Sequence, residues 1–208
     1  MIALVDYGLG NIQAFANIYR HLGIQASPAR TAKDLRAASR IILPGVGAFD
    51  WAMARLQESG LRDALDEEVL VAKKPVLGIC VGMQMMARSS EEGKLPGLGW
   101  IDATVVKFDT HLFNTKTHLP HMGWNDVSPV QTAPLFSDLD APQFYFLHSY
   151  FMKTDRNENV LATSDYGITF TSAVRSGNVY GTQFHPEKSH QWGVQLLNNF
   201  AKLNNHVS

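Results

Sequence analysis

The sequence contains a single cysteine, Cys80, among its 208 residues. This excludes an intrachain disulfide and any zinc site built from several cysteines. It also lacks an excess of charge of either sign, because 18 Lys and Arg residues balance 19 Asp and Glu residues, for a formal net charge of −1. Such a balance provides no basic field to hold a phosphate backbone, so we expect no nucleic-acid partner.

No apolar run is long enough to cross a bilayer. The longest lies around residues 75–87 and is interrupted by Gly78, Gly82 and Gln84. The N-terminus reaches Asp6 after a few apolar residues, with no basic segment before them, and so does not resemble a signal peptide. Repeats and Pro/Ser-rich linkers are absent as well. We therefore expect one cytoplasmic domain over residues 1–208, with no membrane association.

In the first half of the chain, short apolar segments alternate with helical patterns. Strands are predicted at residues 2–5, 24–26, 41–43 and 75–79. Helical patterns cover residues 12–20, 48–56, 61–71 and 81–88, and Thr31 can cap a further short helix. Apolar strands without polar alternation, separated by helices, predict a parallel sheet covered on both faces.

In the second half, strand-like pieces dominate. They occur at residues 103–108, 124–127, 144–147, 159–163, 171–175 and 179–183. A last helix is predicted over residues 189–203, with Ser189 as its cap. The whole pattern predicts an α/β fold in which a mostly parallel central sheet is flanked by helices and carries an antiparallel extension.

The cysteine lies where an apolar strand runs directly into a helical pattern. In Gly78-Ile79-Cys80-Val81-Gly82, glycine occurs two residues before and two residues after Cys80. Small residues there permit the sharp, strained turn of a nucleophile elbow. The turn would place the sulfur at the carboxyl edge of the sheet and near the positive end of a helix, which lowers the pKa of a thiol. A lone cysteine is otherwise more often a buried structural residue, but the elbow favours a nucleophile.

The segment Gln183-Phe184-His185-Pro186-Glu187 supplies a base and a carboxylate to orient it. Pro186 biases His185 towards extended backbone, in which residues i and i+2 point to the same side. Glu187 can therefore lie beside the imidazole of His185, select its tautomer and favour its charged form. An exposed His-Pro turn with a solvated glutamate is the alternative. Together with the elbow, the segment indicates a Cys80–His185–Glu187 arrangement.

Acyl transfer also requires hydrogen-bond donors for a developing oxyanion. The amide of Val81, directly after the cysteine, is one candidate. The segment Pro44-Gly45-Val46-Gly47, at the end of the third strand, offers a second, because its glycines permit close backbone approach and a peptide flip. An ordinary strand-to-helix turn would use glycine there as well.

Two weaker patterns lead us to expect no cofactor and no metal. Gly8-Leu9-Gly10 lacks the third glycine of a dinucleotide-binding fingerprint, because Gln13 occupies its position. His111, His118 and His121 have no carboxylate at metal-ligand spacing.

Five segments occur in the order found in triad (class I) glutamine amidotransferases. They are Pro44-Gly45-Val46-Gly47, Gly78-Ile79-Cys80-Val81-Gly82-Met83-Gln84, Pro120-His121-Met122-Gly123-Trp124-Asn125, His148-Ser149-Tyr150 and Gln183-Phe184-His185-Pro186-Glu187-Lys188-Ser189. The chain resembles this family over essentially its whole length. The third segment narrows the resemblance to the glutaminase subunits of imidazole glycerol phosphate synthases, two-subunit enzymes of histidine biosynthesis.

This resemblance implies a class I glutamine amidotransferase-like fold and hydrolysis of glutamine, without a cofactor. It implies that Cys80 is the nucleophile, His185 the acid and base, and Glu187 the residue that orients His185. The oxyanion amides would belong to Val46 and Val81. Residues matching positions that hold glutamine are Gly47, Gln84, Ser149 and Tyr150. Residues matching the interface with a barrel-type cyclase (synthase) subunit, in a heterodimer, are Asn11, Trp124, Asn125, Tyr145 and Lys188.

The residues leave three alternatives open. Paralogous glutaminase subunits of sugar amidotransferases, from surface-polysaccharide pathways, share these motifs, and residues 11–15 and 99–102 resemble theirs. A cysteine peptidase or stress-response hydrolase of the same superfamily would lack Gln84 and the Trp124-Asn125 segment. A nucleotide-binding module would need the missing third glycine. The motifs together favour the glutaminase of the histidine pathway.

Overall fold

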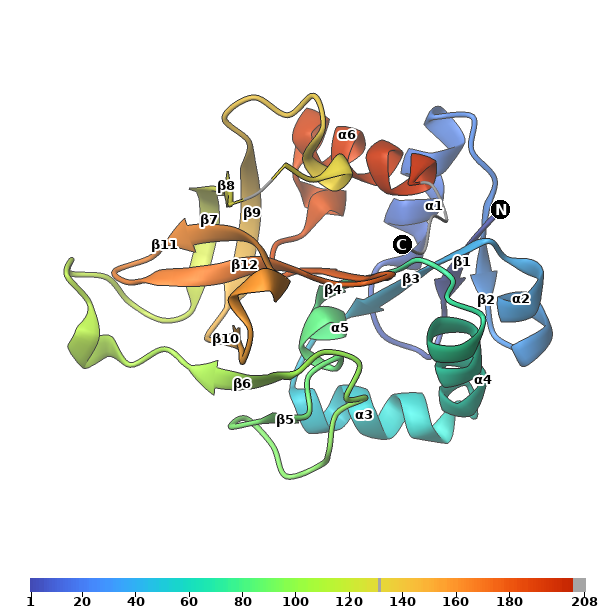
Figure 1. Ribbon diagram of the computed structural model, residues 1–208, viewed down its shortest axis with the longest axis horizontal. Coiled ribbons are helices and arrows are strands. Elements are labelled where there is room, and N and C mark those ends of the chain that lie inside the picture. The colour runs from blue at the N-terminus through green and yellow to red at the C-terminus, as the bar shows by residue number, and fades with distance from the viewer. Residues whose placement is uncertain (131, 204–208) are drawn as a thin grey trace.

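The computed structural model describes residues 1–130 and 132–203 (Figure 1). Its main sheet has eight strands in the order β2-β1-β3-β4-β13-β12-β11-β8. Their bounds are β1 Ile2–Val5, β2 Ala26–Ala29, β3 Arg40–Gly45, β4 Val76–Cys80, β8 Ser128–Pro129, β11 Val160–Asp165, β12 Thr169–Ser176 and β13 Val179–Thr182. The strands from β2 to β13 pair in parallel, and those from β13 to β8 pair antiparallel. The predicted fold class is confirmed.

Helices cover both faces of the parallel part of this sheet. The α-helices are α1 Ile12–His21, α2 Ala32–Ala37, α3 Phe49–Glu58, α4 Arg62–Asp66, α5 Val81–Gln84 and α6 His190–Lys202; a π-helix, η1 Glu67–Val71, continues α4. Short 3-10 turns are η2 Thr110–Leu112, η3 Pro134–Phe136, η4 Asn157–Asn159 and η5 Pro186–Lys188. Helices α1 and α6 lie on one face, and α3 and α4 on the other (Figure 1). Across the described residues, no helix combines the length and apolar character needed to cross a bilayer.

Two smaller sheets extend the second half of the chain. Strands β10 Tyr150–Thr154, β6 Ala103–Lys107 and β5 Ser89–Ser90 form one sheet, and β7 His121–Asp126 pairs antiparallel with β9 Gln143–His148 in the other. The predicted strands at residues 103–108, 124–127 and 144–147 lie in these sheets. Strand β10 was not expected.

The helix predicted over residues 81–88 is wrong beyond its first turn. Helix α5 ends at Gln84 because the next carbonyls accept hydrogen bonds from a separate loop instead of continuing the helix. The pairs are Leu98 to Met85, Ile101 to Met86, Gly99 to Ala87 and Gly97 to Arg88. This loop brings β5 and β6 against α5.

The strand predicted at residues 24–26 begins two residues later, as β2. The Ile24 amide donates to the Tyr19 carbonyl and so belongs to the turn that ends α1. Strand β2 is an edge strand, where Pro28 is tolerated although it has no amide to donate. Ser189 precedes α6 as predicted, but its side chain makes no capping hydrogen bond.

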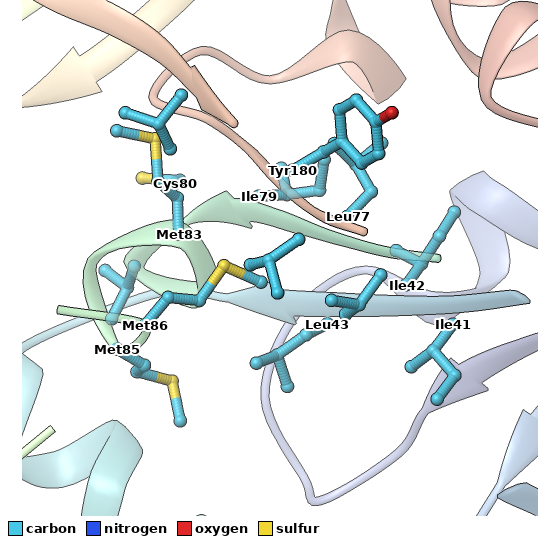
Figure 2. Packing of buried hydrophobic residues seen from close by; sticks show 14 of the residues in the cluster. Ile41, Ile42, Leu43, Leu77, Ile79, Cys80, Met83, Met85, Met86 and Tyr180 are labelled. Carbon is cyan, nitrogen blue, oxygen red and sulfur yellow. The ribbon is translucent and has the colours of Figure 1, made fainter. Parts of the chain in front are cut away.

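Three methionines fill the core beneath the junction of β4 and α5 (Figure 2). Met83, Met85 and Met86 are fully buried among aliphatic side chains of β3 and β4 (Figure 2). Flexible thioether side chains fill irregular gaps of this kind. The end of β4, and with it Cys80, therefore rests on a tightly packed base.

Candidate active site

Cys80 is the last residue of β4 and adopts φ 54° and ψ −114°, a region that few non-glycine residues occupy. The flanking glycines make room for this turn. A Cβ on Gly82 would lie 2.0 Å from the Leu43 carbonyl oxygen, and one on Gly78 would lie 2.6 Å from the Met86 methyl carbon. The strained backbone, held by close packing, is the geometry of a nucleophile elbow.

His185 is brought to Cys80 by the chain that follows β13. Its amide donates to the Tyr145 carbonyl (2.9 Å), and its carbonyl accepts from the Ser189 hydroxyl (2.6 Å). The Ser189 hydroxyl in turn accepts from the Tyr145 amide (3.0 Å), which is why it does not cap α6. His185 Nδ1 donates to Glu187 Oε1 at 2.8 Å, and both side chains are about 95% buried. The expected His185–Glu187 contact is present, but it is made across the 3-10 turn η5 and not along extended backbone as predicted.

The charge balance at His185 favours its protonated form. Burial alone lowers the pKa of His185, but side-chain hydrogen bonds with Cys80 and Glu187 outweigh this effect and raise the pKa to about 10. Nδ1 is occupied by Glu187, so Nε2 is the nitrogen left to exchange a proton with Cys80 or a substrate. The arrangement holds an imidazolium beside the Cys80 sulfur.

Two further groups approach the Cys80 sulfur. The Gln183 Nε2 lies 3.7 Å from it, and the Leu147 carbonyl oxygen lies 3.9 Å from it. Gln183 is fully buried and had no role in the sequence interpretation. No local sequence pattern marks it, because residues 183 and 184 form a bend after β13 instead of extended strand.

The proposed oxyanion donors lie at the ends of adjacent strands. Gly45 pairs with Cys80 across β3 and β4, which places Val46 and Gly47 beside the elbow. Val46 is exposed, and Gly47 has φ +85°, a value that suits glycine. Val81 is buried and opens α5.

The residues expected to hold glutamine fall into two groups. Gln84 is buried, and its Nε2 donates to the Tyr150 carbonyl (3.1 Å) and to Gln183 Oε1 (3.0 Å). Ser149 and Tyr150 are half-buried; Ser149 joins β9 to β10, and Tyr150 is the first residue of β10. Gln84 therefore links the Tyr150 carbonyl to Gln183, whose Nε2 approaches the Cys80 sulfur, whereas Gly47 follows the end of β3.

Three of the expected interface residues gather together. Lys188 Nζ lies 5.7 Å above the Tyr145 ring, and the Trp124 and Tyr145 ring centroids are 6.4 Å apart. Trp124 is exposed and stacks on His190. The other two residues differ from this group.

Asn125 and Asn11 have partners within the chain. The Asn125 Nδ2 donates to the Asp165 carbonyl (2.7 Å) and lies 3.2 Å from His121 Nε2. Asn11 caps α1 by accepting from the Ala14 amide (3.0 Å). His121 is buried, and within the described residues no three His, Cys, Asp or Glu side chains gather as metal ligands.

The sequence matches the family described as glutamine amidotransferase class-I over residues 3–203. It is 56% identical to the imidazole glycerol phosphate synthase subunit HisH of Bdellovibrio bacteriovorus, over 98% of this chain and 100% of that protein. The corresponding subunit of Leptospira interrogans is 49% identical, and subunit HisH 2 of Pseudomonas aeruginosa is 46% identical, with the same coverage.

Solved structures agree on the fold. A structure described as a glutamine amidotransferase superposes with a TM-score of 0.70 at 20% identity, covering 95% of this chain and 98% of that one. A putative GMP synthase subunit from Thermoplasma acidophilum gives 0.69 at 24% identity, covering 96% and 90%. By its sequence and by the elbow, histidine and carboxylate assembled at the edge of its sheet, the chain belongs to the class-I glutamine amidotransferase family.

Proposed function

We propose that the protein is the glutaminase subunit of an imidazole glycerol phosphate synthase. It hydrolyses glutamine to glutamate and ammonia and passes the ammonia to a barrel-type cyclase subunit in a heterodimer, for histidine biosynthesis. One observation carries the proposal: a cysteine on a strained elbow contacts a buried histidine whose Nδ1 lies 2.8 Å from a carboxylate oxygen. The full-length similarity to proteins that bear this subunit name supports it.

In the first half-reaction, the Cys80 thiolate attacks the side-chain amide carbon of glutamine, and the carbonyl electron pair moves onto oxygen. The amides of Val81 and, after a peptide flip, Val46 donate to this oxyanion. The protonated His185 gives its Nε2 proton to the amide nitrogen as the C–N bond breaks. Ammonia leaves, and a γ-glutamyl thioester remains on Cys80.

In the second half-reaction, the now neutral His185 takes a proton from water, and the resulting hydroxide attacks the thioester carbon. Collapse of the tetrahedral intermediate breaks the C–S bond and releases the γ-carboxylic acid, which loses its proton to solvent to give glutamate. The thiolate and the imidazolium are restored. Glu187 keeps the His185 ring oriented through both steps and stabilises its charge.

The sugar-amidotransferase alternative is not favoured. The relatives at 56%, 49% and 46% identity all bear the imidazole glycerol phosphate synthase name. The catalytic residues would serve either pathway, because the glutaminase half-reaction is the same. The ammonia acceptor consumed by the complex with its co-purifying synthase subunit distinguishes the two.

The protein is proposed to be a single domain located in the cytoplasm. Buried apolar residues from β1 to α6 form one continuous cluster, which supports a single glutamine amidotransferase domain over residues 1–208. The mechanism depends on an unoxidised Cys80, and a reducing cytoplasm keeps cysteines unoxidised, which supports a cytoplasmic location.

Replacing the nucleophile tests the proposal. In the complex with the synthase subunit, Cys80→Ala should reduce glutamine-dependent turnover to background and leave ammonia-dependent turnover intact, because only the ammonia source is lost. Both rates are measured on the same preparation. Retention of glutaminase activity by Cys80→Ala would sink the assignment.

The roles of His185 and Glu187 predict an order of severity. His185→Ala should lower glutamine-dependent kcat more than Glu187→Ala, because an orienting group can be lost while the base remains. Steady-state kinetics of the two complexes give the comparison. The opposite order would mean that the two roles are misassigned.

A further inference from the structure

Two histidines outside the catalytic triad meet in the core beside the active site. His121 of β7 and His148 of β9 pair directly across the two-stranded sheet, and both are at least 94% buried. His121 Nδ1 lies 2.9 Å from His148 Nε2. A direct imidazole–imidazole hydrogen bond fixes the relative position of the two strands.

The partners of the pair determine the tautomer of each ring. His148 Nδ1 lies 2.8 Å from the Tyr150 carbonyl oxygen, which only accepts, so Nδ1 carries the proton and Nε2 is the acceptor. His121 Nδ1 must then donate to His148, which leaves His121 Nε2 to accept from the Asn125 amide nitrogen at 3.2 Å. The hydrogen bonds run in one direction from Asn125 to Tyr150.

This chain of bonds ends on the groups assigned to glutamine. The Tyr150 carbonyl accepts from both His148 Nδ1 and Gln84 Nε2. Gln84 Nε2 also donates to Gln183 Oε1, and Gln183 Nε2 approaches the Cys80 sulfur. The histidine pair and the substrate-binding glutamine thus share one backbone acceptor.

Aromatic rings surround the two imidazoles. His121 is stacked between Phe146 and Tyr166, with centroids 4.6 Å and 4.0 Å away. Phe170 packs against both histidines, 5.7 Å from His121 and 5.3 Å from His148. Burying an imidazole costs desolvation free energy unless its nitrogens are hydrogen-bonded. Apolar rings would fill the same space without that cost. We therefore infer that the histidine pair does more than fill space.

We propose that His121 and His148 are positioning residues of the glutamine site, which hold the Tyr150 carbonyl and through it the Gln84 side chain. The inference rests on the proposed function, because it assigns Gln84 and Tyr150 to substrate. His148 acts directly on the Tyr150 carbonyl, and His121 acts through His148.

The test uses the complex with the cyclase subunit and measures steady-state glutamine hydrolysis. His148→Phe keeps a ring but removes the donor to Tyr150, and it should raise KM for glutamine about tenfold with kcat changed less than about threefold. His148→Asn should restore KM to within about threefold of wild type, because its amide nitrogen replaces Nδ1 as the donor. Ammonia-dependent turnover should be unchanged in both variants.

A packing control separates hydrogen bonding from core filling. Phe170→Leu loosens the contact with both rings but removes no hydrogen bond, so it should lower the melting temperature and leave KM unchanged. His121→Phe retains the stack between Phe146 and Tyr166, and it should raise KM about threefold. This variant measures the same linkage if His148→Phe does not fold.

The outcomes are distinct. An unchanged KM in folded His148→Phe or His121→Phe overturns the inference. So does a His148→Asn variant as impaired as His148→Phe, or a Phe170→Leu variant with the same rise in KM. A wild-type complex that does not hydrolyse glutamine contradicts the proposed function instead.

Discussion

Two buried tyrosine hydroxyls each donate a hydrogen bond to a backbone carbonyl, one near the candidate active site and one far from it. The Tyr7 hydroxyl donates to the Pro44 carbonyl (2.7 Å), at the start of the segment that contains Val46. The Tyr19 hydroxyl donates to the Leu197 carbonyl (3.1 Å), between α1 and α6. Burial raises the pKa of both phenols, so both remain donors.

Removing the two hydroxyls should affect stability equally but activity differently. Tyr7→Phe should lower glutamine-dependent turnover about fivefold or more, because the unpaired Pro44 carbonyl loosens the oxyanion segment. Tyr19→Phe should leave turnover unchanged. Both variants should lose about 1 kcal/mol of unfolding free energy in urea denaturation. Equal activity in the two variants would mean that Tyr7 has no influence on the oxyanion donors.

The site residues differ in how far the sequence predicts them. Cys80 is marked by its flanking glycines. The sequence predicts the contact of His185 with Glu187 on extended backbone, whereas the structure makes it across the 3-10 turn η5. The approach of Gln183 to Cys80 has no local sequence signal, because it follows a bend after β13. The Tyr7–Pro44 and His121–His148 bonds join residues 37 and 27 positions apart. No local pattern reports such contacts, because they depend on which strands the fold places side by side.

At the scale of elements, the parallel strands were predictable because they are buried on both faces and therefore continuously apolar. The central strands β1, β3 and β4 are nearly or fully buried along their length. The short strands β5 and β8 contain two residues each, too few to show a period. The early end of α5 was not predictable, since loop amides from residues 97–101 take the helix carbonyls.

The buried histidines of β7 and β9 make the stability of the folded protein sensitive to acid. Burial lowers the pKa of His148 to about 3 and that of His121 to about 4. The unfolded chain, with pKa values near 6.5, binds these protons first, so stability is lost as pH falls from 6.5 towards 4. His185 has the opposite sign: its raised pKa contributes stability below pH 6.5 that is lost as pH rises through about 10.

Urea denaturation between pH 7 and pH 4 tests the acid side. Each buried neutral histidine should steepen the fall in unfolding free energy by up to about 1.4 kcal/mol per pH unit. The His121→Phe/His148→Phe variant should show a shallower slope, because both titrating groups are gone. His21→Phe, at an exposed position, is the control and should follow wild type. Parallel slopes in all three proteins would contradict the assignment of neutral buried rings.

For the whole molecule, the exposed apolar side chains near the elbow define the face that a partner would cover. Val46, Met122, Trp124 and Leu147 are each about 40–60% exposed. The Leu147 carbonyl approaches the Cys80 sulfur, and Val46 follows the residue paired with Cys80. Exposed apolar side chains near a reactive group suit a docking surface that encloses released ammonia. Ammonia is largely protonated in neutral water, so enclosure keeps it reactive.

If the synthase subunit docks on this face, both its binding affinity and its activation of glutamine hydrolysis can be tested. Trp124→Ala should weaken binding to the synthase subunit by about 2 kcal/mol, as expected for an aromatic anchor, and calorimetry measures the change. Leu112→Ala, an exposed apolar side chain on η2, is the control and should bind as wild type. The isolated chain should hydrolyse glutamine slowly and gain at least about tenfold, about 1.4 kcal/mol of coupling, in the complex with bound acceptor, because the proposed oxyanion role of Val46 requires its amide to turn. If the isolated chain works at full rate and Trp124→Ala binds as tightly as wild type, both the docking face and the gating are wrong.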